Sequence, residues 1–185
     1  MTHENVRNAT IKAVTMAKKN GALISVDPNL RLPLWDSPEN AREQMLKAIS
    51  YCDILKISDN EINFITELDD YDEGIAQIQK MYGVPLIFLT MGKDGSRAYY
   101  KTLRVEAKGI EVSDVVDTTG AGDTFCGAIL GRICDLGINN LTEEQLLEMI
   151  TYANAVASLV TQKKGAIKSM PNIGEIDERL KKNII

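Results

Sequence analysis

Short apolar runs alternate with longer stretches of helical periodicity along most of this 185-residue chain, and this alternation constrains the fold more than any other feature. Runs at 22–26, 54–57 and 86–90 predict buried strands, and 98–100 predicts a strand that returns after a turn. Helices are predicted at 6–19, from Pro38 to about Ile49, at 75–82, in two stretches within 141–161, and at 176–182. The alternation predicts an α/β fold: a mainly parallel sheet with helices on both faces, in three α/β/α layers.

Composition limits the classes of function. With 44% hydrophobic and 25% charged residues, the chain is predicted to form one domain over residues 1–185. The net charge is −5 and the longest basic clusters are Lys163-Lys164 and Lys181-Lys182, so a nucleic-acid or anionic-membrane surface is not expected. The sequence has neither an apolar run near the roughly 20 residues that span a bilayer nor a secretory apolar segment at its start. These features predict a cytoplasmic protein that binds small molecules.

The cysteines and the single histidine offer little metal or redox chemistry. Cys52, Cys126 and Cys134 are odd in number and widely spaced, and His3 lies near the N-terminus. A disulfide framework and a zinc site are therefore not expected. Cys126 follows Asp123 closely, but no histidine lies near it in sequence, so we interpret it as a structural cysteine.

The run DTTGAGDTF at 117–125 combines a glycine-rich turn, a carboxylate and the start of an apolar helix. The β-branched residues at 110–116 predict a strand before it, and apolar residues recur at helical spacing from Phe125. The first N–H groups of a helix have no internal partners, so phosphate oxygens can bind there. Glycines at 120 and 122 allow a close approach of the backbone. The run predicts an anion site.

Asp123 has two interpretations at this point. A carboxylate beside a phosphate site is repulsive unless it has a task, and deprotonating an alcohol during phosphoryl transfer is such a task. Asp is also a favoured helix cap, so Asp123 could instead only cap the helix.

Polar residues follow several predicted strands, and the carboxyl ends of parallel strands meet at one edge of a sheet. We therefore expect these residues to share one crevice: Asp27, Asn29, Arg31, Glu61, Thr90, Gly92, Gly95, Asp117 and Asp123.

Together these motifs resemble the ribokinase-like (PfkB) carbohydrate kinases. DTTGAGDTF is similar to the family's C-terminal signature, and DPNLRLPLW at 27–35 resembles the fructokinases in particular. TMGKDG at 90–95 is similar to the family's nucleotide loop, and Ala153-Asn154-Ala155 and Lys163-Lys164-Gly165-Ala166 follow in family order. The resemblance covers essentially the whole chain.

The resemblance implies ATP-dependent phosphorylation of a sugar hydroxyl, most similar to a fructokinase. Asp123 would be the general base, and the N–H groups of Gly120, Ala121 and Gly122 would form the anion hole. Thr90, Gly92, Gly95 and Asn154 would contact ATP. Asp117, Thr119 and Gly165 fall where many members hold a monovalent cation such as K⁺.

The resemblance also implies roles for residues earlier in the chain. Asp27, Asn29 and Arg31 would contact the sugar, and Glu61 matches the last position of an N-x-x-E motif that organises Mg²⁺ through water. Ser58 stands where that motif has Asn. Structural alternatives remain open: Asp117 could cap the Thr118-Thr119 turn, Asp27 and Asn29 could shape the proline loop, and Arg31 could pair with a surface carboxylate.

Compared with the family, the N-terminal strands, the Gly-Gly sugar motif and the β-sheet lid are not represented, so the chain resembles a C-terminal portion. We expect it to have little or no sugar kinase activity alone, and to associate, as a homo-oligomer or otherwise, through an exposed sheet edge. Two alternatives remain: a nucleotide-binding or regulatory fragment without catalysis, and a hydrolase that uses Asp123 or Cys126.

Overall fold

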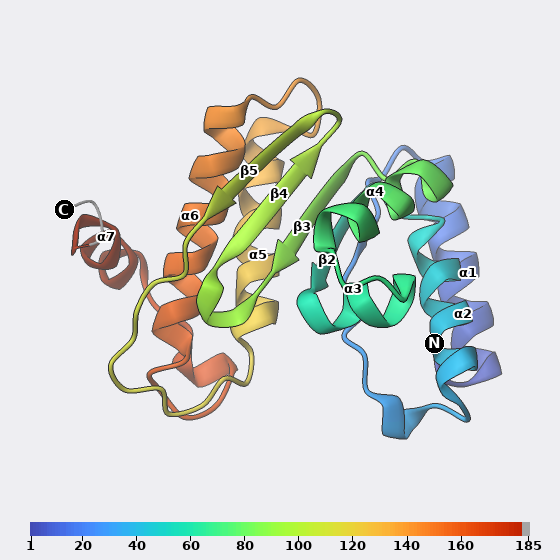
Figure 1. The fold of residues 1–185 in the computed structure, drawn as a ribbon, viewed down its shortest axis with the longest axis horizontal. Helices are drawn as coiled ribbons and strands as arrows, with labels where there is room; N and C mark the ends of the chain where they lie inside the picture. The colour runs from blue at the N-terminus through green and yellow to red at the C-terminus, as the bar shows by residue number, and fades with distance from the viewer. Residues whose placement is uncertain (183–185) are drawn as a thin grey trace. The chain divides into compact units, whose positions relative to one another are not determined.

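The computed structural model describes residues 1–182, and the chain divides into two compact units, Met1–Leu89 and Thr90–Ile185 (Figure 1). The first unit contains α1 (Glu4–Lys19), β1 (Ser25–Val26), η1 (Leu32–Leu34), α2 (Pro38–Ile49), β2 (Ile54–Ser58), α3 (Asp59–Thr66), α4 (Tyr71–Tyr82) and β3 (Leu86–Thr90), whose last residue begins the second unit. The second contains η2 (Gly92–Asp94), β4 (Ser96–Tyr100), β5 (Leu103–Ala107), α5 (Ala121–Leu136), α6 (Glu143–Val160), η3 (Ile167–Ser169) and α7 (Ile173–Lys182). The α/β fold class predicted from the sequence is confirmed, whereas the single domain stays a prediction.

The strands of the first unit follow the order β1-β2-β3. β1 runs parallel to β2, with Ser25 opposite Ile54 and Val26 opposite Leu55. β2 and β3 are nearly continuous apolar runs, and Leu55, Ile57 and Phe88 have no exposed surface. Strands covered on both faces require such runs, so these residues form the core of the unit.

Local sequence determines where the helices of the first unit begin. The side chain of Ser37 accepts a hydrogen bond from the Asn40 N–H, and Pro38 occupies the first helical position of α2, as the sequence predicted. α3 begins with a capping box, in which Ser58 and Glu61 bond each other's backbone N–H. The helix at 59–66 was not predicted, although the pattern Ser-x-x-Glu before an apolar run is its signal.

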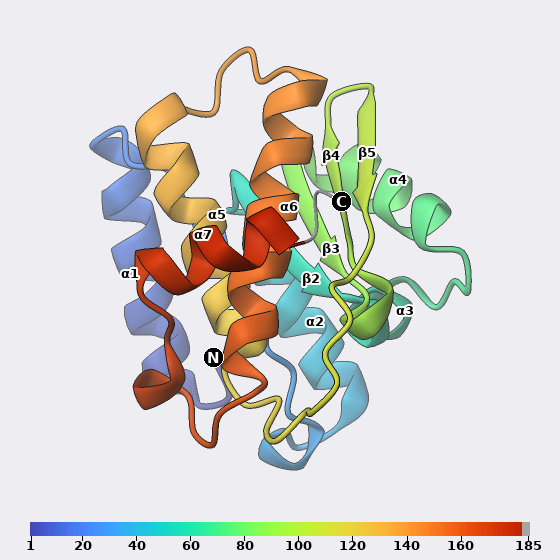
Figure 2. The same cartoon turned by 90° about the vertical axis from the view of Figure 1, so that its left-hand side faces the viewer.

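In the second unit, α6 packs on a β-hairpin. β4 and β5 pair antiparallel, with Ala98 opposite Val105. α6 contacts both strands and also packs against α5 and α7. Figure 2 shows α7 crossing α6. The buried residues of α6 include Leu146, Ile150 and Ala153, which supply much of this unit's core.

Two expectations for the second unit are wrong. Residues 110–116 form no strand: the Val116 N–H donates to the Thr161 carbonyl at the end of α6, and Val115 and Val116 are each 59% exposed. β-branched residues alone therefore gave a false strand signal. The two helical stretches expected within 141–161 are one helix, α6, because residues 143–160 contain neither glycine nor proline. Its predicted cap is confirmed, since Thr142 accepts a hydrogen bond from the Gln145 N–H.

Among residues 1–182, no helix combines the length and apolar character needed to cross a membrane. The cytoplasmic location stays a prediction.

Removing the α2 cap is expected to destabilise the chain. Ser37→Ala leaves the Asn40 N–H without its acceptor and should lower the free energy of unfolding by about 1 kcal/mol in urea denaturation. Ser37→Asp, which retains an acceptor, should stay close to the original stability. Equal losses in the two variants would contradict the capping role.

Candidate active site

In the second unit, Asp117 ties together two loops that are distant in sequence. Its carboxylate accepts the Thr119 N–H at 2.9 Å and the Gly165 N–H at 3.1 Å. The N–H groups of Val116 and Asp117 both donate to the Thr161 carbonyl at the end of α6, at 2.8 and 3.2 Å. The loop before α5 is therefore attached to the loop after α6.

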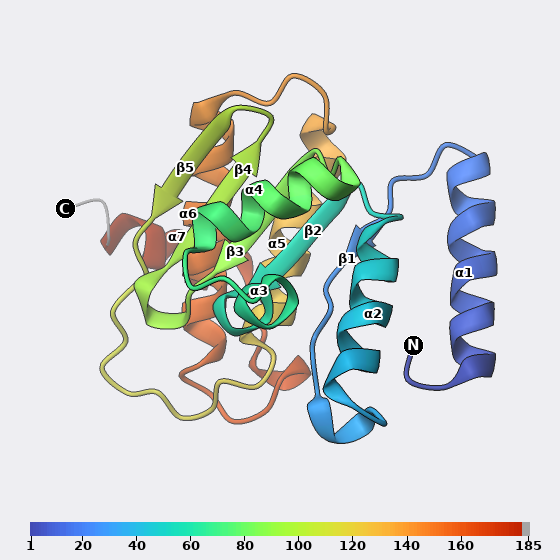
Figure 3. The same cartoon turned by 45° about the vertical axis from the view of Figure 1, so that its right-hand side comes forward.

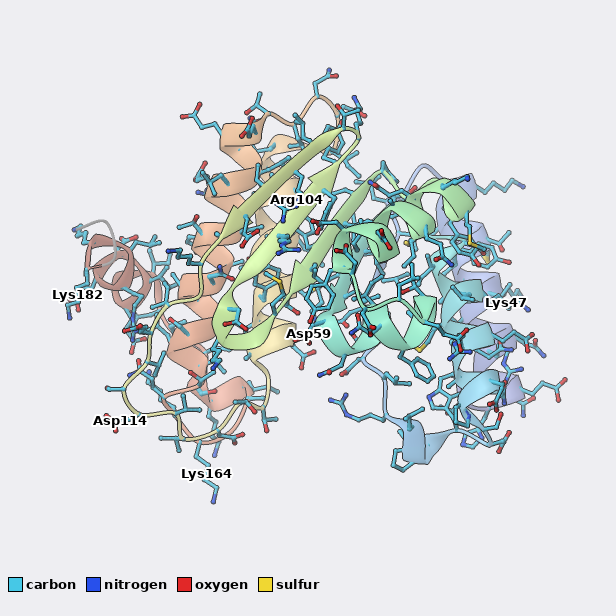
Figure 4. The ribbon with its side chains drawn as sticks, viewed as in Figure 1. Lys47, Asp59, Arg104, Asp114, Lys164 and Lys182 are labelled. Atoms are coloured by element: carbon cyan, nitrogen blue, oxygen red, sulfur yellow. The ribbon has the colours of Figure 1, made fainter. Side chains whose placement is uncertain are left out.

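These hydrogen bonds favour the charged form of Asp117. Its pKa is lowered from the ordinary value, first by the side-chain bond with Thr119, then by the backbone bonds from Thr119 and Gly165 and by the nearby charge of Lys164. Figure 4 shows the Lys164 side chain extending away from its loop. Both N–H groups therefore bind the ionised carboxylate more strongly than they would bind its protonated form.

Gly120 lies where the two loops touch. Its φ is +85°, in the left-handed region, and an added Cβ would lie 2.8 Å from the Ala166 Cβ. Ser169 is 1% exposed, and its hydroxyl donates to the carbonyls of Gly165 and Ala166. Ser169 thereby braces the segment that meets Gly120, a role that the sequence analysis missed.

α5 starts at this junction without a side-chain cap. Gly120 is the cap residue and makes no side-chain hydrogen bond. Asp123 is the third residue of the helix and is exposed, so the alternative that it is the helix cap is wrong. The Ala121 N–H donates to the Thr118 carbonyl at 3.2 Å, and the Thr124 N–H closes the first turn on Gly120 at 2.8 Å. The uncapped helix start offers backbone N–H groups to an anion, and the exposed carboxylate beside it can accept a proton from a hydroxyl group.

The predicted nucleotide loop follows Thr90, the half-buried last residue of β3. Gly95 has a φ of +105°, and an added Cβ would lie 2.1 Å from the Ala107 carbonyl oxygen. Gly92 has a φ of +56° with open space around it. Gly109, which the sequence analysis did not single out, leaves no room for a Cβ either, since the Lys93 carbonyl oxygen would be 2.0 Å away. The backbones at 92–95 and 107–109 therefore lie in direct contact.

Asn154 on α6 makes hydrogen bonds beside the contact between the backbones at 92–95 and 107–109. Its Oδ1 accepts the Ser96 hydroxyl at 2.9 Å, and its Nδ2 donates to the carbonyls of Ala107 and Lys108 at 3.3 and 3.2 Å. Its amide is thus largely engaged within the protein, and it shapes the nucleotide loop by joining α6 to β4 and the end of β5.

In the first unit, the loop after β1 is held at two points. The Lys56 ammonium on β2 lies 3.2 Å from one carboxylate oxygen of Asp27 and 3.4 Å from the other. Lys56 is only 8% exposed, and the sequence analysis did not single it out. The sequence does carry a signal for Lys56, which is a lysine within the apolar run at 54–57. A buried ammonium requires a partner of opposite charge, so such a lysine indicates an ion pair.

The Glu61 carboxylate is the second group that holds the loop after β1. One carboxylate oxygen accepts the Leu30 N–H at 2.8 Å, and the other accepts the N–H and hydroxyl of Ser58, each at 2.9 Å. Glu61 is 7% exposed, so three donors surround a nearly buried carboxylate. These bonds occupy three of the roughly four acceptor positions of the carboxylate. Figure 4 labels the adjacent Asp59, at the first position of α3.

The other two predicted sugar residues extend toward solvent. Asn29 is exposed with a φ of +47°, and Arg31 is exposed and bonds the Leu30 carbonyl through Nη1 at 2.8 Å. Within residues 1–182, no group of three or more His, Cys, Asp or Glu side chains could hold a metal ion.

The predicted residues thus fall into two sets. The first unit holds Asp27, Asn29, Arg31 and Glu61, and the second holds Thr90, Gly92, Gly95, Asp117, Thr119, the 120–123 turn, Asn154 and Gly165. The shared crevice stays a prediction.

Within residues 1–182, Cys52, Cys126 and Cys134 form no disulfide bond. Burial raises the pKa of the Cys52 thiol to about 12, so this residue is unreactive near neutral pH.

Comparison with known proteins gives one consistent picture. Residues 2–173 match the family model described as pfkB family carbohydrate kinase. Probable fructokinase-4 of Arabidopsis thaliana is 42% identical over 180 residues, which cover 97% of this chain and 55% of that protein. Putative fructokinase-8 of the same plant is 41% identical, with 98% of this chain and 86% of that protein covered.

A solved structure supports the same assignment of fold. The fructokinase of Vibrio cholerae O395, solved with fructose, ADP and calcium ion, is 29% identical with a TM-score of 0.86. The similarity covers 97% of this chain and 57% of that one. The predicted ribokinase-like fold is confirmed, and the chain spans about half the length of several curated relatives that it matches.

The close packing at Gly95 predicts a matched pair of effects. Gly95→Ala combines a left-handed φ with a clash against the Ala107 carbonyl and should lower the free energy of unfolding by about 2 kcal/mol or more. Gly92→Ala meets open space and should lose only about 1 kcal/mol, from its φ alone. Chemical denaturation followed by circular dichroism measures both, and a larger loss at Gly92 would contradict the packing described.

The lowered pKa of Asp117 predicts an acid transition at its junction. Its contribution is present above its ordinary pKa and is lost as the pH falls through the lowered, folded-state pKa. The Gly165 amide NMR signal should therefore move during an acid titration. Asp117→Asn should abolish this movement and Asp114→Asn, in the same exposed loop, should preserve it. A Gly165 signal with the same pH dependence in Asp117→Asn would contradict the assignment.

Proposed function

The chain belongs to the pfkB family of carbohydrate kinases, and we propose that it carries the phosphoryl-transfer chemistry of an ATP-dependent sugar kinase, with fructose as the sugar. One observation carries the proposal most directly. The start of α5 has no side-chain cap and is fixed by the Gly120 and Asp117 contacts, with the Asp123 carboxylate in its first turn.

Asp123 and the turn before it divide the chemistry between them. Asp123 is exposed, so a sugar hydroxyl can reach its carboxylate and transfer a proton to it. The backbone N–H groups at 120–122 would act as the anion hole for the transferring phosphoryl group, helped by the positive end of the helix dipole. Because the Ala121 N–H is shared with the Thr118 carbonyl at 3.2 Å, Gly120 and Gly122 are the stronger candidates as donors.

The nucleotide would bind along the glycine loop at 90–95. Gly92 has open space around it, which leaves room for a ligand beside the backbone. Asn154 would contribute mainly by holding Ser96 and the 107–108 carbonyls in place, because its amide already makes three hydrogen bonds there.

Cations would enter in two ways. Mg²⁺ would arrive as MgATP, and Glu61 would reach it only through water, since its carboxylate already accepts three hydrogen bonds. Asp117, Thr119 and Gly165 offer one carboxylate and two backbone carbonyls, hard oxygen donors that fit K⁺. A monovalent cation held there would add positive charge beside the anion hole.

The sugar would contact the loop at 27–31. The Asp27 and Glu61 contacts give this loop a defined shape, and the exposed Asn29 and Arg31 supply polar groups for sugar hydroxyls. The similarity to the Vibrio protein, whose structure contains fructose, supports fructose over other sugars.

Because the chain spans about half of several relatives, we propose that alone it binds nucleotide and has little or no sugar kinase activity. A nucleotide-binding or regulatory fragment is the alternative, and sugar-dependent ADP formation separates the two. The outer edge of β1 would support association with a second copy or with another polypeptide.

The base assignment predicts a separation of binding from turnover. Asp123→Asn should leave MgATP affinity nearly unchanged in calorimetric titration, while sugar-dependent ADP formation falls by a factor of about 10² to 10⁴. The control is Asp135→Asn, an exposed carboxylate near the other end of α5, which should change neither. Turnover that survives in Asp123→Asn, measured at high protein concentration, would rule out this base.

A further inference from the structure

The segment between α6 and α7, residues 161–172, carries one side of the Asp117 junction but has little packing of its own. Gly165, whose N–H donates to Asp117, has a φ of +94°, and an added Cβ would meet only open space. Ile167 is 83% exposed, and Ser169 is the single buried residue of the segment. Figure 3 shows this segment and the loop before α5 reaching the same end of the second unit. The position of the Gly165 N–H therefore depends on the side chains that hold the segment.

α7 holds this segment through two side chains. The Glu175 carboxylate lies 2.8 Å from the Lys163 ammonium. One turn further along α7, the Arg179 guanidinium donates to the side-chain oxygen of Gln162. Ile176 on α7 is buried, and the helix packs against α6, which it crosses in Figure 2. A helix that is itself anchored therefore bonds two adjacent residues of the segment.

The start of α7 fixes the Glu175 side chain. One carboxylate oxygen accepts the Asn172 N–H at 2.8 Å, and the Asn172 Oδ1 accepts the Glu175 N–H at 3.1 Å. This reciprocal pair is a capping box. The hydrogen bond with the Lys163 side chain, followed by that from the Asn172 N–H, lowers the pKa of Glu175 from its ordinary value. The carboxylate thus caps α7 with one oxygen and binds Lys163 with the other.

The exposure of the Lys163–Glu175 pair separates position from stability. The two side chains are 46% and 38% exposed, and ion pairs so open to solvent add little to the free energy of unfolding. Only Lys164, which is exposed, lies between Lys163 and Gly165. The pair can therefore determine where the Gly165 N–H lies while contributing little to the stability of the fold.

We propose that Glu175 is a positioning residue for the Asp117 junction: α7 holds Lys163, and Lys163 keeps the Gly165 N–H on the Asp117 carboxylate. When the ion pair is removed, the segment leaves the carboxylate more often, although both helices stay folded. α7 thereby acts on the start of α5, the proposed phosphate site, without contacting a ligand. The effect on the junction does not depend on the proposed function.

Neutralising Glu175 tests this role. Glu175→Gln removes the charge that Lys163 binds but keeps a side-chain oxygen for the Asn172 N–H, so α7 retains its cap. Amide hydrogen exchange at Gly165 should become at least about fivefold faster, because the junction opens more often. The midpoint of urea unfolding should stay unchanged. Glu178→Gln, which alters an exposed carboxylate on the same helix, should change neither quantity.

The substitution on the other side of the pair shows whether the two charges act together. Lys163→Met should accelerate exchange at Gly165 to the same extent as Glu175→Gln. The double variant should be no faster than either single variant, because both changes remove one interaction.

Four outcomes would overturn the proposal. They are unchanged exchange at Gly165 in Glu175→Gln, equal acceleration in Glu178→Gln, additive acceleration in the double variant, and a fall in the urea midpoint large enough to account for the faster exchange. All measurements are made without nucleotide or sugar, so their outcome is separate from that of the proposed kinase chemistry.

Discussion

The second unit depends on the carboxylate of Asp117. By accepting N–H groups from Thr119 and Gly165, it joins the loop before α5 to the loop after α6. That junction brings Gly120 so close to Ala166 that no side chain fits at residue 120. Gly120 can then turn the chain into α5 with a positive φ and no capping side chain. The open N–H groups at the start of α5 therefore lie beside a contact between residues 48 positions apart.

The first unit uses buried charges in a similar way. Lys56 on β2 pairs with Asp27, which directly follows β1, and Glu61 connects the end of β2 to the backbone at Leu30. Removing one partner of a buried pair typically costs about 3–5 kcal/mol, because the other charge remains unpaired. Such pairs keep the 27–31 loop in one shape. The three side chains thereby connect the core strands to the loop proposed to contact the sugar.

Sequence patterns predicted the elements whose signals are local. The caps at Ser37 and Thr142 and the apolar runs at 54–57 and 86–90 correspond closely to observed elements. One failure involves a contact between distant segments. The β-branched residues at 110–116 form no strand, and the Val116 N–H donates to the Thr161 carbonyl at the end of α6. Nothing local to those residues reveals that contact.

The candidate site was likewise predicted from the sequence only in part. The glycine turn, its aspartates and the glycine loop were predicted from sequence, whereas Lys56, Ser169 and Gly109 were not. Each of these acts on a residue that sequence patterns do not place beside it: Lys56 on Asp27, Ser169 on the carbonyls of Gly165 and Ala166, and Gly109 on Lys93. The contact of Asn154 with a nucleotide stays a prediction, and in the structure its amide bonds the Ser96 hydroxyl on β4 and the carbonyls of Ala107 and Lys108 at the end of β5.

The central claim is that the start of α5, held open by the Asp117 junction, binds the phosphates of a nucleotide. An amide NMR titration of the isotopically labelled chain with MgATP tests it most directly. The amide signals of Gly120, Gly122 and Asp123 should shift most among the residues of α5 and its preceding loop, and Asp117→Asn should weaken these shifts. Nucleotide binding that leaves those three signals in place, or that is unchanged in Asp117→Asn, would contradict it.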